Sequence, residues 1–423
     1  MSNTAQHTLP LPCASAIDRL LRDRVVAQLR ALQSGAITLR DPWESITLGE
    51  ATDRAPPPTL RVNDARFYRA IALGGSVGAA EAYMDGAWTC DDLVGLVRLL
   101  VRNRDLLDDV ERGPARVAGW ALRLVHALRR NTTSGARRNI AAHYDMGNTF
   151  FRLFLSEDLM YSSASFERED DTLEAASTRK LETICRKLQL REGDRVLEIG
   201  TGWGGFALHV AREHRCHVTT TTLSREQYEL ARERVAEAGL QDRVTVFMRD
   251  FRQLDGTYDK LASIEMVEAI GPENLRRYFA CIGERLTPQG LALVQAITIE
   301  DHRYEQAVRS VDFIKRHVFP GSFIPSIAAM MSAKTAASDL ALLDLEDMGL
   351  SYARTLQAWR ERFLDRLPQV RALGFDERFI RMWEFYLAYC EGGFRERSIG
   401  VAQMLFARPG YRPNAQAAAT AEE

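Results

Sequence analysis

The sequence lacks the features that mark secreted, membrane-spanning and metal-rich proteins. Its six cysteines form no C-x-x-C pair and have no clustered histidine partner. They therefore predict reduced thiols, with no disulfide framework, no zinc site and no other metal. No apolar run reaches the roughly 18 residues that span a bilayer, and the first twenty residues lack the basic start and apolar core of a signal peptide. These absences predict a cytoplasmic protein.

An excess of either charge is also missing. The formal net charge is −2 over 423 residues, so bulk electrostatics favour neither nucleic acid nor membrane, and no nucleic-acid partner is expected. The 46% hydrophobic content is enough for a folded core. A chain of this length is long for a single core and predicts two domains.

The distribution of turns and apolar runs predicts three parts. Residues 1–110 are expected to form a small α+β N-terminal domain, 111–139 a basic linker, and 140–423 the larger domain. From Asp171 onward, helical and strand patterns alternate, which predicts a doubly wound, Rossmann-like α/β sheet that is largely parallel. A long helical insertion at about 304–334 interrupts the rhythm before two late strands complete the sheet.

The segment 196–205 is the most informative, because an apolar strand containing Glu198 runs directly into a glycine turn with Gly200 and Gly202. The turn has no Gly-Lys-Ser/Thr, which excludes a P-loop. The next strand, 217–222, carries no acid for a dinucleotide ribose. An acid at the strand end suits a cationic cofactor without phosphate, such as S-adenosylmethionine.

The helix start at 224–227 has two interpretations. Ser224 and Gln227 fit a capping box, in which each side chain satisfies a backbone N–H of the other. Alternatively, Thr222, Leu223 and Gln227 hold the ribose of the cofactor in place of the missing acid.

Two later strand ends carry further candidates. Asp250 and Phe251 follow the third strand, where they could bond and stack on an adenine or simply form a surface turn. Glu268 lies among apolar residues just after the fourth strand. Ligands bind at the carboxyl ends of strands in such sheets, and an acid in apolar surroundings needs a partner, so we predict a chemical role for Glu268.

At this point the chain resembles a known family, the cyclopropane-fatty-acyl-phospholipid synthases, from about residue 60 to the end. The shared segments, in the same order, include residues 143–148, 161–166, 197–205, 222–227, 265–271, 319–321, 349–356 and 375–383. The resemblance implies a class I methyltransferase that uses S-adenosylmethionine to convert the cis double bond of an unsaturated phospholipid acyl chain into a cyclopropane. It also implies formation of a homodimer. The apolar residues of the helical insertion, beside Lys315 and Arg316, predict either an entrance that binds the acyl chain or packing in the core.

The resemblance also implies roles for individual residues. Tyr144 matches a position beside the reacting carbons. The positions that match cofactor contacts are Tyr161, Ser162, Gly200, Gly202, Thr222, Leu223, Gln227 and Ile264. A bicarbonate ion removes a proton in the family, and its site matches Glu268, Tyr352 and Ile297.

Two positions depart from the pattern of the bicarbonate site: Ser163 replaces a cysteine and Gln295 replaces a histidine. Serine keeps the backbone amide. Glutamine keeps an N–H donor but cannot carry a proton near neutrality. Bicarbonate is therefore still expected as an ion bound to the enzyme, while a different fate of the lipid cation stays open.

The stretch 112–144 contains no acid but has arginines between apolar residues. Such a segment predicts either a packed connecting helix or a basic helix that docks on anionic lipid at the inner face of the membrane. Three other functions stay open. They are methylation of the same lipids without ring closure (giving methylene-branched, methyl-branched or furan-precursor chains), N-methylation of a small amine, and a non-catalytic lipid- or cofactor-binding role.

Overall fold

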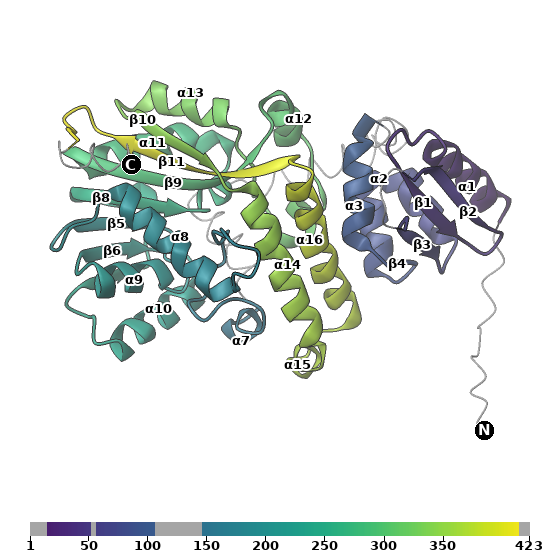
Figure 1. Cartoon of the computed structure of the whole chain (residues 1–423), viewed down its shortest axis with the longest axis horizontal. Coiled ribbons are helices and arrows are strands. Elements are labelled where there is room, and N and C mark those ends of the chain that lie inside the picture. The colour runs from purple at the N-terminus through teal and green to yellow at the C-terminus, as the bar shows by residue number, and fades with distance from the viewer. Residues whose placement is uncertain (1–14, 52–55, 106–145, 414–423) are drawn as a thin grey trace. The chain divides into compact units, whose positions relative to one another are not determined.

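A computed structural model describes residues 15–51, 56–105 and 146–413, and the chain divides into two compact units (Figure 1). The first unit contains residues 1–122 and 374–396, and the second contains 123–373 and 397–423. Most of the predicted linker, and Tyr144 with it, lies outside the described residues.

The first unit combines a four-stranded sheet, in the order β2-β1-β3-β4, with helices that pack against one another. Its strands are β1 (Gly35–Arg40), β2 (Ser45–Glu50), β3 (Thr59–Val62) and β4 (Trp88–Cys90), and its helices are α1 (Ala16–Leu29), α2 (Arg66–Met84), α3 (Leu93–Arg102) and α16 (Glu377–Arg395). Gly75 has a φ of +58° and kinks α2, where the sequence predicts a break between two helices.

Helix α16 joins this unit although it lies far along the chain. The Tyr83 hydroxyl donates to Glu384 Oε2 over 2.9 Å, and Arg98 Nε donates to Glu396 Oε1 over 2.6 Å. A Cβ on Gly392 would lie 2.6 Å from Val97 Cγ1, so glycine allows α16 to approach α3 closely. The domain boundaries expected from sequence instead group residues 374–396 with the larger domain.

The second unit is built on a seven-stranded sheet in the order β10-β11-β9-β8-β5-β6-β7 (Figure 1). All neighbouring pairs are parallel except those of β11, which runs antiparallel to both β9 and β10. The strands are β5 (Arg195–Ile199), β6 (His217–Thr221), β7 (Val244–Phe247), β8 (Tyr258–Ile264), β9 (Leu286–Ile299), β10 (Ala341–Asp347) and β11 (Ile399–Ala407). The predicted doubly wound, largely parallel sheet is confirmed.

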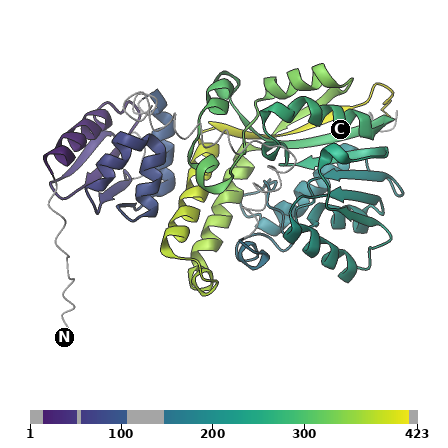
Figure 2. The ribbon, with the colours of Figure 1, turned by 180° about the vertical axis from the view of Figure 1, so that it is seen from behind.

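Successive side chains along the strands point to opposite faces of the sheet, and each face has its own hydrophobic core. Val196 and Leu293 pack with helices α8 (Leu173–Leu188), α9 (Gly205–Glu213) and α10 (Arg225–Glu237). Leu197 and Val294 point to the other face and pack with α11 (Leu275–Arg285) and α13 (Ile327–Ala337). In Figure 1 helix α8 crosses in front of the strands, and Figure 2 brings the opposite face forward. Period-two burial on both faces is the signature of a doubly wound sheet.

The insertion after β9 is helical, as expected, but it is not continuous. It consists of α12 (Tyr304–Arg309), a π-helix at Ile314–Val318, and α13. Pro320 lacks an N–H donor and Gly321 has a φ of +79°, so the chain turns there. Helices α14 (Gly349–Asp365) and α15 (Leu367–Ala372) follow β10. Within the described residues, no helix is both long enough and apolar enough to cross a membrane.

Candidate active site

The glycine turn after β5 needs glycine for its backbone conformation. Gly200, Gly202 and Gly204 have φ values of +105°, +51° and +86°, which L side chains rarely adopt. The N–H groups of Gly200 and Thr201 both donate to the Thr221 carbonyl, which fixes the turn beside β6. A Cβ on Gly202 would meet no atom of the described residues within 4 Å. The turn therefore borders open space, as a cofactor site requires.

Glu198 lies under this turn and is only 2% exposed. Its Oε2 accepts a hydrogen bond from the Thr220 hydroxyl over 2.6 Å. Burial raises the pKa of Glu198 to about 8, and the nearby Lys180 ammonium opposes that rise. A further positive charge beside the turn would favour the ionised carboxylate, so the residue suits a cationic ligand.

Lys180 itself is fully buried on α8, and its Nζ donates to the Ser162 hydroxyl over 2.8 Å. Burial lowers the pKa of Lys180 to about 8, while the charges of Asp158, Glu265 and Glu198 act in the opposite direction. The ammonium thus supplies positive charge to two acids, one at the end of β5 and one at the end of β8.

The helix start at Ser224 confirms the capping interpretation in part. The Ser224 hydroxyl accepts from the Gln227 N–H over 3.3 Å, while the Gln227 side chain accepts from the Thr222 hydroxyl over 2.8 Å. Thr222 and Gln227 are both buried, and Leu223 is half-buried between them. A ribose-binding role for these three residues stays a prediction.

Asp250 and Phe251 already have partners within the chain. Asp250 forms a two-pronged ion pair with the Arg252 guanidinium, with distances of 2.7 Å to Nε and 2.6 Å to Nη2. The Phe251 ring packs edge-on against Tyr278 in the core, with the centroids 5.9 Å apart. Asp250 is 4% exposed, so the segment is not a surface turn. Adenine binding by either residue stays a prediction.

The carboxyl-terminal parts of β8 and β9 hold a cluster of hydrogen-bonded polar groups. Glu265 Oε1 accepts from the Ser163 backbone N–H and from Gln295 Nε2, both over 2.8 Å. The Tyr352 hydroxyl on α14 also bonds to Glu265 and lowers its pKa, against the larger effect of burial, which raises it. Ile264 precedes this residue at the end of β8 and is 8% exposed.

Glu268 lies one turn further along, in a 3₁₀ turn at Val267–Ala269. Its Oε1 accepts from the Ile297 backbone N–H over 2.5 Å, and its buried Oε2 has no hydrogen-bond partner among the described residues. Burial and the neighbouring charge of Glu265 raise the pKa of Glu268 to about 8. The pKa values of both carboxyl groups are therefore raised, and the charge on one disfavours the charge on the other.

The Gln295 amide is oriented by a second buried amide. Gln403 Nε2 on the adjacent strand β11 donates to Gln295 Oε1 over 3.1 Å, which turns Gln295 Nε2 toward Glu265. Gln295, Gln403 and Ser163 are all 0% exposed. The Ser163 hydroxyl donates to the Ala164 carbonyl, so only the backbone of Ser163 serves the cluster.

Aromatic rings gather next to this carboxyl pair. The Tyr161 ring lies 5.2 Å from Trp359, 5.4 Å from Phe151 and 6.3 Å from Phe319, centroid to centroid. Tyr352 joins the two clusters, because its ring lies 6.0 Å from Trp359 while its hydroxyl bonds to Glu265. Faces of aromatic rings attract cations, so the arrangement suits a reaction that passes through positive charge.

The comparisons with known proteins identify the family. The family described as Mycolic acid cyclopropane synthetase matches residues 131–404. The chain belongs to this family. It is 36% identical to the tuberculostearic acid methyltransferase UfaA1 of Mycobacterium tuberculosis, over 95% of this chain and 93% of that protein. It is 35% identical to the Escherichia coli cyclopropane-fatty-acyl-phospholipid synthase, over 85% of this chain and 90% of that protein.

Solved structures agree with this membership. The cyclopropane synthase MmaA2 of M. tuberculosis superposes with a TM-score of 0.60 at 28% identity, covering 64% of this chain and 98% of MmaA2. Coclaurine N-methyltransferase has a TM-score of 0.61 at 21% identity, covering 78% of this chain and 99% of that chain, which shows a shared fold alone. The chain is therefore an S-adenosylmethionine-dependent methyltransferase of the cyclopropane synthase family, with lipid methyl or methylene transfer as its activity class.

The site of this family member contains three side chains that sequence reasoning missed: Lys180, Glu265 and Gln403. Each left a signal. Lys180 stands on the apolar stripe of helix 173–188, between Ala176 and Ile184. Gln403 interrupts an apolar strand in the same way. Glu265 occurs in a shared segment, but only Glu268 was assigned a role there.

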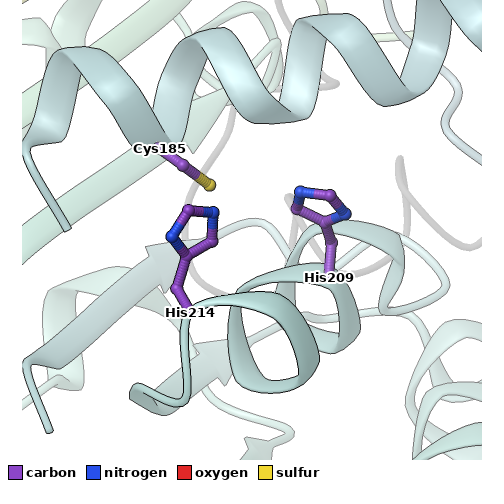
Figure 3. Close-up of side chains that lie close together, drawn as sticks. All are labelled: Cys185, His209 and His214. Carbon is purple, nitrogen blue, oxygen red and sulfur yellow. The ribbon is translucent and has the colours of Figure 1, made fainter. Parts of the chain in front are cut away.

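A second cluster departs from the prediction that the cysteines lack histidine neighbours. Cys185 on α8 faces His209 of α9 and His214, which follows α9, with ligand atoms within 4.8 Å of one another (Figure 3). Helix packing brings them together, which residue spacing did not reveal. Glu182 lies 2.7 Å from His209 Nε2 and 3.3 Å from His214 Nε2. The ligand types suit zinc, but ion pairs with Glu182 account for the positions of both histidines without a metal.

Proposed function

We propose that this enzyme adds the methyl carbon of S-adenosylmethionine to the cis double bond of an unsaturated phospholipid acyl chain and closes a cyclopropane ring. The carboxyl pair of Glu265 and Glu268, which follows β8 and is joined through Tyr352 to an aromatic cluster, carries this proposal. An alkene is a weak nucleophile that becomes a cation on methylation. A site that combines aromatic faces with a buried base suits that sequence.

Some residues of the site are proposed to bind the cofactor and the lipid, and others to take part in proton removal. When bound, S-adenosylmethionine supplies an electrophilic methyl group on a positively charged sulfur. Glu198 and the turn at Gly200–Gly204 are proposed to hold it, and Tyr161 with Ser162 borders it. Tyr144, outside the described residues, is proposed to contact the reacting carbons. A dry apolar lining is needed because water would trap the cation as an alcohol.

The family resemblance assigns proton removal to a bicarbonate ion held by Glu268, Tyr352, Ile297, Gln295 and the backbone of Ser163. In this chain, three of those positions, Ser163, Gln295 and Tyr352, hydrogen-bond to the Glu265 carboxylate. The Glu265 carboxylate would thus compete with bicarbonate for the same hydrogen-bond donors.

Access to a lipid substrate requires contact with a membrane surface. We propose that the enzyme acts from the cytoplasm while docked on the inner face of the membrane, with the basic stretch 112–144 as the docking segment. Homodimer formation is carried over from the family as a prediction.

A second candidate is methyl transfer to the same lipids without ring closure. The similarity to a relative named as a methyltransferase, over 95% of this chain, favours it. The two products differ in the fate of the cation. Ring closure removes a proton from the transferred methyl group while the cation stays on the neighbouring carbon, whereas the methylene product needs a hydride shift to that carbon before the methyl group loses its proton.

The deciding experiment incubates the enzyme with labelled S-adenosylmethionine and oleoyl phospholipid vesicles, and then examines the lipid by NMR. Cyclopropane protons at high field are the expected result. Olefinic methylene protons instead would favour the second candidate, since ring and methylene products share a mass. Labelling of soluble amines but not vesicles would indicate N-methylation. The matched control is Glu268→Gln, and label incorporation equal to wild type would remove Glu268 from the chemistry.

A further inference from the structure

Glu265 is the point on which the polar groups of the site converge. Donors from three separate segments bond to its carboxylate: the Ser163 backbone at the start of the catalytic fold, Gln295 on β9 and Tyr352 on α14. Resting on the proposed alkene methylation, we propose that the Glu265 carboxylate is the base that takes the proton from the alkylated lipid, in place of an external bicarbonate.

The donors around Glu265 converge on one oxygen of an anion. Ser163 N–H and Gln295 Nε2 both lie 2.8 Å from the carboxylate oxygen Oε1. A carboxylate and a bicarbonate ion can each offer such an oxygen to these donors. Since the Glu265 side chain already accepts from these donors, a free anion would have to displace it.

The backbone conformation at Glu265 indicates that this position requires its glutamate side chain. Its φ of +48° lies in the left-handed region, where glycine is unstrained and glutamate is not. The conformation is held by the Glu265 N–H, which donates to the Gln295 carbonyl over 2.7 Å. Strain of this kind persists at functional sites, where a particular side chain must point in a particular direction.

Glu265 is less buried than the residues that donate to it, since Gln295 and Ser163 are fully buried. Burial raises the pKa of Glu265, and the nearby Lys180 ammonium opposes that rise. Burial and the charge of Glu265 raise the pKa of the adjacent Glu268 to about 8. Glu268 is thus a positioning residue that holds the β9 backbone at Ile297.

The proposed step balances without a further reactant. The S–CH₃ bond breaks with its electron pair left on sulfur, while the π pair of the alkene forms the new C–C bond and leaves a cation on the adjacent carbon. For ring closure, a C–H bond of the transferred methyl group then breaks, and its electron pair forms the bond to the cationic carbon. For the open-chain methylene product, a hydride first shifts from the methyl-bearing carbon to the cationic carbon, and the electron pair of a methyl C–H bond then forms the double bond. In both cases the proton goes to Glu265. The protonated carboxyl returns to the anion by releasing the proton to solvent after product departs.

The test compares wild type with Glu265→Gly and Glu265→Gln, in buffer freed of carbon dioxide and with added bicarbonate. Glycine removes the carboxylate, relieves the positive φ and leaves room for an anion. Glutamine keeps the volume but removes the base. Two readouts are used: methyl transfer to oleoyl vesicles, and bicarbonate binding measured by calorimetry on protein loaded with S-adenosylhomocysteine.

Wild type is expected to turn over equally with and without bicarbonate and to show no saturable bicarbonate binding. Glu265→Gly should lose about 10²–10⁴-fold in rate, gain bicarbonate binding and recover at least tenfold when bicarbonate is added. Glu265→Gln should lose activity without recovery. Saturable bicarbonate binding to wild type, or a wild-type rate that requires bicarbonate, would overturn the assignment.

The two readouts separate this inference from the proposed function. If wild type methylates no lipid, the proposed function fails, yet the calorimetry still decides whether Glu265 fills an oxyanion site. Binding gained only by Glu265→Gly supports the assignment, and binding by neither protein refutes it.

Discussion

Lys180 is the residue on which the charge balance of the site depends. Its ammonium is buried and hydrogen-bonds to a neutral hydroxyl, yet its charge favours the ionised forms of Glu198 and Glu265. Burying an ammonium costs free energy unless nearby anions offset it. The Lys180 ammonium therefore opposes the effect of burial on two acids, Glu198 on β5 and Glu265 directly after β8.

We predict that Lys180→Met shifts the acidic limb of the kcat/KM profile to higher pH. Removing the positive charge raises the pKa of Glu265, so a higher pH is needed to ionise it. Activity at neutral pH should fall about tenfold and recover toward wild type at alkaline pH. The measurement is initial-rate methyl transfer to vesicles between about pH 6 and 9, the range that brackets such a shift.

The matched control is Lys187→Met on the same helix, since Lys187 pairs with Asp344 and Glu346 on β10. That variant should keep the wild-type profile. An unshifted limb in Lys180→Met would show that Lys180 does not set the ionisation of the base.

Individual residues of the site were predictable where an acid or glycine ended an apolar strand. Glu198, Glu268 and the glycine turn follow this rule. Glu265 and Gln403 were not predictable. The position of Glu265 depends on a left-handed backbone, and that of Gln403 depends on the pairing of β11 with β9, two strands that are far apart in the chain. Sequence pattern carries neither fact.

At the scale of elements, the packing of α8 against α9 places a titratable histidine, His209, next to Glu182. Burial lowers the pKa of His209 in the folded chain below its ordinary value of 6.5, although Glu182 opposes the shift. The unfolded chain then binds the proton more readily, so the free energy of unfolding falls as pH drops through this range. We predict that this group lowers the free energy of unfolding as the pH falls below about 6.5, its ordinary pKa.

Thermal unfolding of wild type and His209→Gln checks this prediction, and the variant should show a shallower pH slope. A parallel series with EDTA tests the alternative interpretation of the cluster. An unchanged melting temperature fits the Glu182 network, whereas a large drop would mean that Cys185, His209 and His214 hold a metal.

The elements themselves were largely readable, because strands and helices alternate with clear periods from residue 173 onward. The insertion was harder to divide, since its apolar residues recur through a region that Pro320 and Gly321 interrupt. The membership of α16 in the first unit was not readable. Its apolar face fits α2 and α3, but amphipathic periodicity does not name the partner.

At the scale of the whole molecule, α16 ties a late segment of the chain to an early one. We predict that Gly392→Ala destabilises the first unit by about 1–3 kcal/mol, because the new Cβ would lie 2.6 Å from Val97 Cγ1. Amide hydrogen exchange in α3 should accelerate, while exchange in β5 and α8 stays as in wild type. The control is Gly74→Ala, where a Cβ meets no atom of the described residues within 4 Å. Equal exchange in both variants would contradict the close packing.

The remaining prediction concerns how a lipid methyltransferase with a net charge of −2 binds to a membrane surface. The arginines at positions 116, 123, 129, 130, 137 and 138 form a local excess of positive charge, and each cation near an anionic surface contributes about 1 kcal/mol. Replacing all of them with glutamine should weaken binding to anionic vesicles by at least a hundredfold and remove its salt dependence. Binding to neutral vesicles should change little, which separates docking from substrate recognition. Co-sedimentation at two salt concentrations measures both. Unchanged affinity for anionic vesicles would mean that the segment serves as a packed connection between the two units.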